Sequence, residues 1–298
     1  MPGTRLSIEP PRCCLRATDI ETRTLYQKGL SFVRESPTTA STWLGGTFSV
    51  GDIVGLLPIL NEAGTIRQVI DGIFSTGSID RLLVVDDGSV DGTLDQLDYA
   101  RRQYPQLDVE VRHDQRGLGS ALLHGFREAV KRYAFDRLVV LDGDLSHDPA
   151  TIPTLLAKPY DLVVGSRYTT GGRIENWGLP RRWISFAANL VARRLLRLKV
   201  QDITSGFRVY TKPLVETILA NAACGGYEFQ VETVWLASRQ NYTIAEVPIA
   251  FVERRAGESK LATPEEAFKF ARFVVTKAVY PRKPGTKGLR SPGARRSS

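Results

Sequence analysis

Short apolar segments alternate with amphipathic segments through the first half of the chain. Four apolar runs occupy residues 53–57, 81–85, 109–112 and 137–141. Each is followed by a stretch with helical spacing of its apolar positions, at residues 65–74, 92–104, 117–133 and 150–156. Strands that alternate with helices in this way favour a mostly parallel sheet with helices on both faces. The pattern predicts an α/β fold whose ligands bind beyond the carboxyl ends of the strands.

The second half of the chain is less regular. An apolar run at residues 161–164 precedes a Gly171-Gly172 turn. A long helix is expected over residues 181–200, and a segment at 202–210 follows it. Further elements are helices at residues 213–220 and 228–239, a strand at 244–252 and a helix at 264–280. That last helix opens with Pro264 and two acidic residues, a composition typical of a helix N-terminus.

The charge distribution changes the first impression that the composition gives. The 298 residues hold 40 Lys and Arg against 32 Asp and Glu, for a net charge of +8, which at first indicates a polyanionic partner. Residues 281–298, however, hold six basic and no acidic side chains, whereas residues 51–280 are balanced. We therefore expect no nucleic acid as a partner. The alternative from another class of function is a nucleic-acid-binding protein that uses the basic tail.

Cysteine usage and apolar content bear on location. Cys13, Cys14 and Cys224 form neither a disulfide framework nor a spaced metal-ligand set, which favours a reducing, cytoplasmic compartment. The chain has no run of about 18 apolar residues that would span a bilayer. We expect residues 1–50 to form a poorly ordered extension, residues 263–280 an amphipathic helix and residues 281–298 a disordered basic tail.

Acidic residues cluster directly after two of the apolar strands. Asp86 and Asp87 follow one strand, where carboxylates suit hydrogen bonds to a ribose or a base. Asp142 and Asp144, separated by Gly143, follow another strand and suit one divalent cation together with phosphate oxygens. Each loop alone also fits a turn with a capped helix. The two loops together favour a nucleotide and metal site.

Several segments of the chain carry a family resemblance. They are PILNE at 58–62, VVDDGSVDGT at 84–93, RGLGSA at 116–121, LDGDLSHDP at 141–149, GSRYTTGGRIENWGLPRR at 165–182, DITSGFRVY at 202–210, GYEFQVE at 226–232 and EVPIAFVERRAGESKL at 246–261. With these motifs the chain resembles family-two glycosyltransferases of the GT-A fold, and among them the polyprenyl-phosphate (dolichyl-phosphate) mannosyltransferases. The resemblance implies a GT-A domain over residues 51–262, with a Rossmann-like, mostly parallel sheet and C-terminal amphipathic helices.

The resemblance also implies roles for particular residues. The donor nucleotide-sugar would be bound by Pro58, Leu60, Glu62, Val84, Asp86, Asp142, Gly143, Arg167, Arg254 and Lys260. The acceptor phosphate would be bound by Arg167, Arg181 and Ser185. Asp144 would hold Mg²⁺ or Mn²⁺, with Ser146 and Asp142 as further candidate ligands. Asp144, Arg254 and Lys260 would be the catalytic residues.

The implied reaction is an inverting transfer of mannose from GDP-mannose to a polyprenyl phosphate. The alternatives within the family are a UDP-sugar donor and a soluble or polysaccharide acceptor. Because the acceptor is a lipid, we expect peripheral binding at the cytoplasmic face of a membrane, and a membrane-anchoring partner subunit is a further expectation. Residues 181–199 combine a polar stripe (Arg181, Ser185, Asn189, Arg193, Arg197) with a wide apolar face, which suits either a membrane surface or docking on the sheet.

Overall fold

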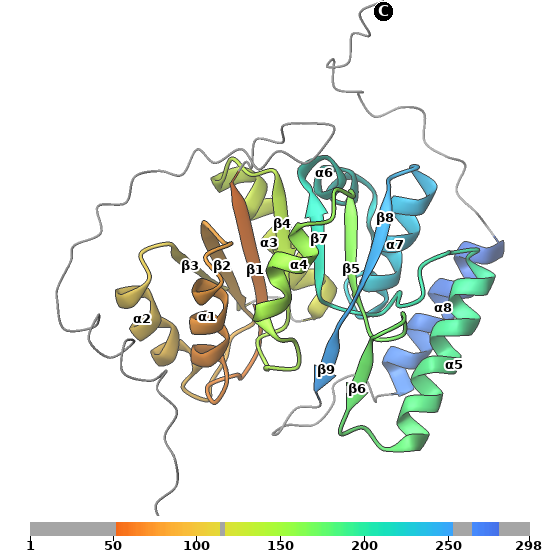
Figure 1. Cartoon of the computed structure of the whole chain (residues 1–298), viewed down its shortest axis with the longest axis horizontal. Coiled ribbons are helices and arrows are strands. Elements are labelled where there is room, and N and C mark those ends of the chain that lie inside the picture. Colours follow the sequence, from red (N-terminus) through yellow and green to blue (C-terminus); the bar gives the residue numbers. More distant parts are fainter. Residues whose placement is uncertain (1–51, 114–116, 253–263, 280–298) are drawn as a thin grey trace, which may run out of the picture. The chain divides into compact units, whose positions relative to one another are not determined.

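A seven-stranded sheet lies at the centre of the computed structural model, which describes residues 52–113, 117–252 and 264–279. The strands of this sheet are β1 (Ile53–Ile59), β2 (Arg81–Asp86), β3 (Leu107–Val111), β4 (Arg137–Val140), β5 (Leu162–Ser166), β7 (Arg208–Thr211) and β8 (Ile244–Pro248). Their order is β3-β2-β1-β4-β7-β5-β8. β7 is antiparallel to both of its neighbours, and the other adjacent pairs are parallel. The predicted mostly parallel α/β fold is therefore confirmed (Figure 1).

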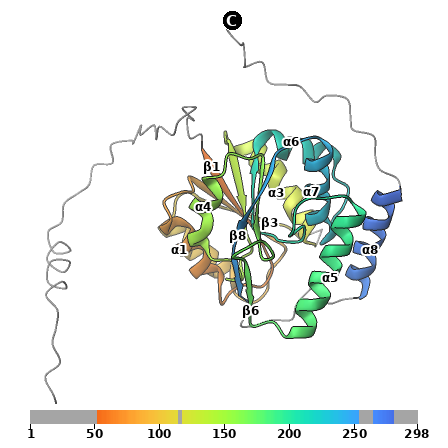
Figure 2. The same ribbon diagram turned by 45° about the vertical axis from the view of Figure 1, so that its right-hand side comes forward.

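Helices cover both faces of this sheet, and a small second sheet lies beside it (Figures 1 and 2). The helices are α1 (Ile66–Ser75), α2 (Thr93–Gln103), α3 (Leu118–Arg132), the 3₁₀ turn η1 (Pro149–Thr151), α4 (Ile152–Leu156), α5 (Leu179–Leu195), α6 (Lys212–Asn221), α7 (Glu228–Arg239) and α8 (Pro264–Val279). The second sheet pairs β6 (Arg173–Glu175) with β9 (Ala250–Val252) in parallel. No described helix is both long enough and apolar enough to cross a membrane.

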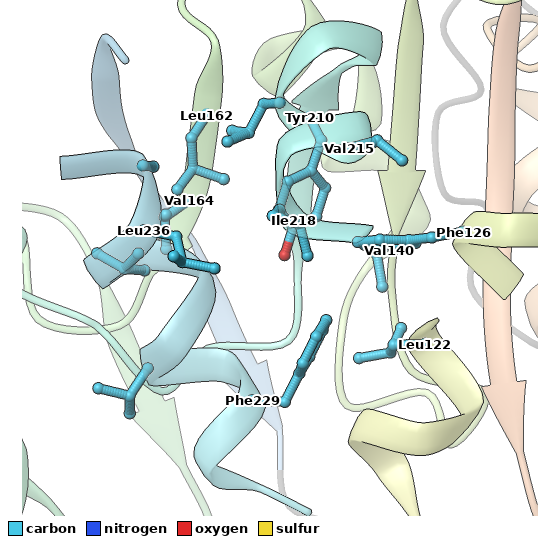
Figure 3. Packing of buried hydrophobic residues seen from close by; sticks show 14 of the residues in the cluster. Leu122, Phe126, Val140, Leu162, Val164, Tyr210, Val215, Ile218, Phe229 and Leu236 are labelled. Atoms are coloured by element: carbon cyan, nitrogen blue, oxygen red, sulfur yellow. The ribbon is translucent and has the colours of Figure 1, made fainter. Parts of the chain in front are cut away.

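The strands bury both of their faces, so two separate hydrophobic clusters form. In β1, Val54 and Leu56 belong to the cluster under α3, α6 and α7, whereas Leu57 and Ile59 belong to the cluster under α1, α2 and α4. This follows from the alternation of side chains along a strand. In the first cluster the Phe126 ring meets those of Tyr210 and Phe229 edge to face, with centroids 5.3 and 6.0 Å apart (Figure 3).

Two elements in the second half differ from the sequence-based expectation. The strand expected over residues 244–252 is divided at Ile249, whose N–H donates to Ser166 of the main sheet while its carbonyl accepts from Arg173 of β6. The helix expected over residues 181–200 ends at Leu195 because the chain turns there: Arg197 adopts a left-handed φ of 57° and the Leu198 N–H donates to the Arg193 carbonyl at 2.8 Å. The predicted tails, residues 1–50 and 281–298, lie outside the described residues.

The start of α3 packs directly on the backbone that precedes α7. A Cβ atom at Gly119 would lie 2.7 Å from the Gly226 carbonyl oxygen and 2.7 Å from the Phe229 Cβ. Ser120 also donates from its N–H to the Gly225 carbonyl at 3.0 Å. The backbones at Gly119 and Gly226 cannot move apart without breaking the hydrogen bond between Ser120 and Gly225.

We predict that Gly119→Ala destabilises the protein by about 1–3 kcal/mol, because the added methyl overpacks against backbone atoms. The measurement is the urea midpoint of unfolding followed by circular dichroism. Gly64→Ala is the control, since a Cβ there meets nothing within 4 Å. Equal midpoints for both variants would contradict the proposed contact.

Candidate active site

The predicted site residues gather at one edge of the sheet. Because β1, β2, β4 and β5 are parallel, their carboxyl ends lie at the same edge, and the antiparallel β7 begins there. The loops that leave these strands contain Leu60, Glu62, Asp142, Gly143, Asp144, Ser146 and Arg167, and Pro58, Val84 and Asp86 lie on β1 and β2 themselves. The topology thus brings together residues that are more than 80 positions apart in the chain.

The three loops after β1, β2 and β4 are joined to one another by hydrogen bonds. The Asn61 N–H donates to Ser89 Oγ at 2.7 Å, and the Glu62 N–H donates to Thr93 Oγ1 at 2.9 Å. The Thr65 hydroxyl donates to the Gly143 carbonyl at 2.9 Å, which ties the β1 loop to the β4 loop. This network ties the segment that contains Leu60 and Glu62 to the neighbouring loops.

The two neighbouring acids after β2 have different roles in the structure. Asp86 is fully buried and accepts hydrogen bonds from the N–H groups of Gly88 and Ser89 at 2.9 and 2.7 Å. Asp87 instead forms a buried ion pair with Arg112 and accepts from the Gly117 N–H at 3.1 Å. Asp87 thereby anchors the start of α3. Of the two, Asp86 stays the candidate for the donor nucleotide.

Pro58 and Val84 stand behind these loops. Both are buried in adjacent strands, and the Val84 side chain belongs to the hydrophobic cluster under α1 and α2. Val84 is in register with Leu57 and Pro58 with Val85, so the side chains of Pro58 and Val84 point to opposite faces of the sheet, and their contact with the donor stays a prediction.

The loop after β4 presents the candidate metal ligands. Asp144 is largely buried, and its Oδ1 accepts from the Ser146 N–H at 3.0 Å and from the Ser146 hydroxyl at 2.5 Å. These bonds fix the orientation of the carboxylate, so the structure pairs Ser146 with Asp144. Carboxylate and hydroxyl oxygens are hard donors of the kind that Mg²⁺ and Mn²⁺ prefer, and the donor set fits such an ion. Among the described residues, no cluster of three His, Cys, Asp or Glu side chains forms a metal cage.

Asp142 lies on the same loop, against the backbone that precedes β7. A Cβ atom at Gly206 would lie 3.1 Å from both of its carboxylate oxygens, so a side chain there would require the carboxylate to shift. His147 beneath it is buried, and its Nδ1 accepts from the Asp142 N–H at 3.4 Å. Burial lowers the pKa of His147 below its usual value, more than the nearby Asp142 raises it, which fits a neutral ring that accepts this bond.

Arg167, predicted to contact both phosphates, forms a buried bidentate ion pair with Asp202. Its Nε lies 2.7 Å from Asp202 Oδ2 and its Nη2 lies 2.8 Å from Oδ1, while Nη2 also donates to Thr204 Oγ1 at 2.8 Å. Burial by itself would lower the pKa of Arg167 and raise that of Asp202, but their mutual attraction outweighs it, and both pKa shifts favour the charged forms. Nη1 donates to no described residue, and a contact of this buried guanidinium with a ligand phosphate stays a prediction.

Aromatic side chains surround this guanidinium. The ring centroids of Phe251, Tyr168 and Trp177 lie 5.3, 5.4 and 6.0 Å from the Arg167 Cζ. Tyr168 connects this group to α5, because its hydroxyl lies 2.9 Å from the hydroxyl of Ser185. Of the predicted acceptor residues, Arg167 and Ser185 therefore lie on either side of Tyr168.

Three predicted residues cannot be placed in this geometry. Arg254 and Lys260 lie outside the described residues, as does the side chain of Arg181 at the start of α5. Their proposed contacts with phosphate remain predictions.

Sequence reasoning missed the residues that hold the site together. Asp202 stands in a quoted motif, yet nothing local indicates that its partner is Arg167, 35 positions earlier. Asn189, expected on the polar stripe of residues 181–199, is buried: its side-chain amide donates to the Gln201 carbonyl and accepts from the Ile203 N–H at 3.1 Å. Asn189 thereby fastens α5 to the segment that carries Asp202.

Comparison with known proteins agrees with this arrangement. Residues 56–219, which include the loops after β1, β2, β4 and β5, match glycosyl transferase family 2. The chain belongs to this family. It is a glycosyltransferase, as the sequence motifs predicted.

Two curated relatives are similar over most of their length. The chain is 38% identical over 213 residues to an undecaprenyl-phosphate mannosyltransferase of Micrococcus luteus, with 70% of this chain and 87% of the relative covered. It is 35% identical over 226 residues to a polyprenol monophosphomannose synthase of Mycolicibacterium smegmatis, with 73% and 85% covered.

Solved structures of this glycosyltransferase's fold include glucosyl-3-phosphoglycerate synthase from Mycobacterium tuberculosis. A complex of that enzyme with Mn²⁺, UDP and phosphoglyceric acid has a TM-score of 0.55 and 22% sequence identity, with 77% of this chain and 78% of that chain covered. The likeness confirms the predicted GT-A type of fold.

We predict that Asp202→Asn destabilises this glycosyltransferase by about 3–5 kcal/mol at pH 7, because it leaves the buried Arg167 without its counter-ion. Since the folded pKa of Asp202 lies below the unfolded value of about 3.9, the stabilisation is complete above that pH and is lost as the pH falls through the folded pKa. The difference between wild type and variant should therefore shrink below about pH 4.

Urea denaturation at pH 7 and at low pH measures both effects. Glu175→Gln removes the partner of Arg173 in an exposed pair and should cost less than about 1 kcal/mol. A variant of Asp202 as stable as this control would show that the buried pair contributes no stability.

Proposed function

We propose that this glycosyltransferase transfers mannose from GDP-mannose to a polyprenyl phosphate, with inversion at the anomeric carbon. Both curated relatives support the sugar and the acceptor, because one is an undecaprenyl-phosphate mannosyltransferase and the other a polyprenol monophosphomannose synthase. Glycosyl transfer in family 2 supports the reaction type. GDP as the nucleotide rests on the motif resemblance of the second half of the chain.

The observation that carries the lipid acceptor is the orientation of α5. Its apolar side chains Leu179, Trp183, Ile184, Val191 and Leu195 are 68, 67, 70, 55 and 49% exposed, while the polar Asn189 is buried. On the same helix, Ser185 is hydrogen-bonded to Tyr168 beside Arg167. An outward apolar face next to an arginine proposed to bind phosphate suits an acceptor with an apolar chain and a phosphate head. A soluble acceptor would leave this apolar face exposed to water.

The residues of the site would divide the work of the reaction. The network of Asn61, Thr65 and Ser89 holds the nucleotide loops before the donor arrives. Asp144, with Asp142 and Ser146 near it, would hold Mg²⁺ or Mn²⁺, which when bound neutralises negative charge on the leaving nucleoside diphosphate. Asp202 and the aromatic rings hold Arg167 so that its Nη1 edge meets a phosphate oxygen.

The acceptor itself supplies the nucleophile. A phosphate oxygen of the polyprenyl phosphate forms the new bond to the anomeric carbon while the bond to the nucleoside diphosphate breaks. Because the second pKa of a phosphate monoester is about 6, this oxygen is already anionic at neutral pH and requires no strong general base. Positioning and charge neutralisation, including by Arg254 and Lys260, are therefore the main contributions expected of the protein.

We expect mannose from GDP-mannose, and no sugar from UDP-glucose or UDP-N-acetylglucosamine, to enter the lipid phase when each labelled donor is offered with a short polyprenyl phosphate and Mg²⁺ or Mn²⁺. Asp144→Ala should lower the rate by about 100-fold or more, because the leaving diphosphate loses its charge neutralisation. Organic extraction followed by scintillation counting measures both. Asp98→Ala, at an exposed position of α2, is the control.

Other outcomes of this screen would lead to other conclusions. Label that enters the lipid phase from a UDP-sugar would contradict the donor, and label that stays in the aqueous phase on a soluble product would contradict the acceptor. A UDP-sugar donor is a specific alternative, because the glucosyl-3-phosphoglycerate synthase of similar fold was crystallised with UDP. Full activity of Asp144→Ala at saturating metal would contradict the role of Asp144.

We also propose that α5 and α8 lie on the surface of a membrane at its cytoplasmic face. The two helices contact each other and run side by side (Figures 1 and 2). α8 adds Phe268, Val275 and Val279, which are 67, 56 and 62% exposed, while Phe273 and Val274 on its other side are buried. Helices with one face this apolar and exposed are suited to the interface between head groups and acyl chains. A membrane-anchoring partner subunit would use the same face.

Trp183→Glu and Ile184→Glu should each weaken binding to lipid vesicles by about tenfold or more, because burial of one such side chain contributes about 1.5–3 kcal/mol. Co-sedimentation with vesicles measures the bound fraction. Val90→Glu is the matched control, since Val90 is 87% exposed on the loop before α2, away from both helices. Unchanged binding of the two α5 variants would exclude this face as the membrane contact.

A further inference from the structure

A basic pocket lies where α5, α7 and α8 end. It has a volume of about 270 Å³, several times the roughly 30 Å³ that a water molecule occupies in the liquid. Its polar lining consists of Arg197, Ser238, Arg239 and Lys277. Trp235 and the leucines at the end of α5 supply the apolar lining. None of these residues belongs to the candidate active site.

The positive charge of this pocket exceeds what its neighbours neutralise. Lys277 lies 3.6 Å from the buried carboxylate of Glu232, which accounts for one cation. Arg197 and Arg239 form no ion pair with any carboxylate in the described ranges. Arg239 and Lys277 also lie over the Trp235 ring, at 5.8 and 4.7 Å from its centroid, so three cationic groups share one small space.

Cations are common in the last turn of a helix, where they interact favourably with the helix dipole. That accounts for Arg239 in α7 and Lys277 in α8. It does not account for Arg197, which follows the end of α5 in a left-handed conformation with a φ of 57°. Glycine is the preferred residue at this position of a helix end, because a side chain there is strained. An arginine at a position that favours glycine indicates that its side chain serves a purpose other than stability.

The rim of the pocket continues into the exposed apolar faces of α5 and α8. Leu195, itself 49% exposed, lines the pocket, and Ala278, which also lines it, precedes Val279, which is 62% exposed. A water-soluble polyanion such as RNA would leave these apolar side chains in water. A phospholipid offers a phosphate for the pocket and acyl chains for the apolar faces together.

We propose that this pocket binds the phosphate of an anionic phospholipid head group, and that it is a lipid site separate from the acceptor site. Arg197 and Arg239 would donate to the phosphate oxygens, and Ser238 would add a neutral donor. Leu195, which ends α5 and lines the pocket, lies ten residues after Ser185, about 15 Å further along the helix at 1.5 Å per residue. The lipid phosphate would therefore bind beyond the C-terminal end of α5, separate from the acceptor phosphate beside Ser185.

This inference rests on the proposed membrane contact of α5 and α8, and it adds a preference for anionic lipid. Bound lipid at one end of α5 would set the direction of that helix on the membrane, and with it the position of Ser185. The site that binds the lipid and the site that transfers the sugar can be tested independently.

The test is co-sedimentation of the full chain with vesicles of phosphatidylcholine alone and of phosphatidylcholine mixed with phosphatidylglycerol. We expect wild type to prefer the mixed vesicles, and Arg197→Gly and Arg239→Gln each to reduce this preference about fivefold, the effect of one basic residue at an anionic surface. Arg194→Gln is the matched control, because Arg194 is exposed on the same helix and does not line the pocket. It should retain most of the preference.

Arg197→Gly also separates binding from folding. Since glycine relieves the left-handed position, its midpoint of thermal unfolding should equal or exceed that of wild type. Its rate of sugar transfer to a short polyprenyl phosphate without vesicles should equal the wild-type rate, because Arg197 lies outside the candidate active site.

Three results would overturn the proposal: equal loss of the preference in Arg194→Gln and Arg197→Gly, no preference for mixed vesicles in wild type, or displacement of the bound protein by single-stranded RNA with unchanged Arg197 dependence. The first would show a diffuse surface charge, and the last a nucleic-acid site. Absence of sugar transfer in wild type without vesicles would count against the proposed function and leave the lipid preference as measured.

Discussion

The hydrogen-bonding direction of the parallel strands is the constraint on which the candidate site depends. Parallel pairing of β1 with β2 and β4 places their carboxyl ends at one edge. Because β7 is antiparallel to β4, the segment before β7, which contains Asp202, lies at the same edge. Acidic loops that are far apart in the chain become neighbours there. Their mutual hydrogen bonds, such as that from Thr65 to the Gly143 carbonyl, then fix the loops relative to one another.

Two of the acids at this edge are neutralised by arginines. Asp87 is neutralised by Arg112, and Asp202 by Arg167, each in a buried ion pair. A buried arginine is tolerated because its carboxylate partner offsets the loss of water, and the bidentate geometry holds the guanidinium plane in one orientation. Pre-orientation of this kind lowers the entropic cost of binding a phosphate.

Helix α5 buries a narrow face and exposes its large apolar side chains. α5 is attached to the protein through the polar Asn189 and the small Ala192, whereas its large apolar residues Trp183 and Ile184 face outward. Such an inverted amphipathic helix leaves apolar area in water unless another apolar phase covers it. The attachment through Asn189 to the segment carrying Asp202 joins this outer surface to the Arg167 side of the candidate site.

The sequence by itself determined the α/β class, the glycosyltransferase family and the loops that carry Asp86, Asp142 and Asp144, because periodicity and short motifs are local properties of the chain. It also marked residues 181–199 as amphipathic. Only the tertiary structure decided which face of that helix is buried, that β9 leaves the main sheet, and that Arg167 pairs with Asp202. These features depend on contacts between segments that are distant in the chain. A periodic pattern of apolar residues does not specify whether the protein itself or its surroundings will cover those residues.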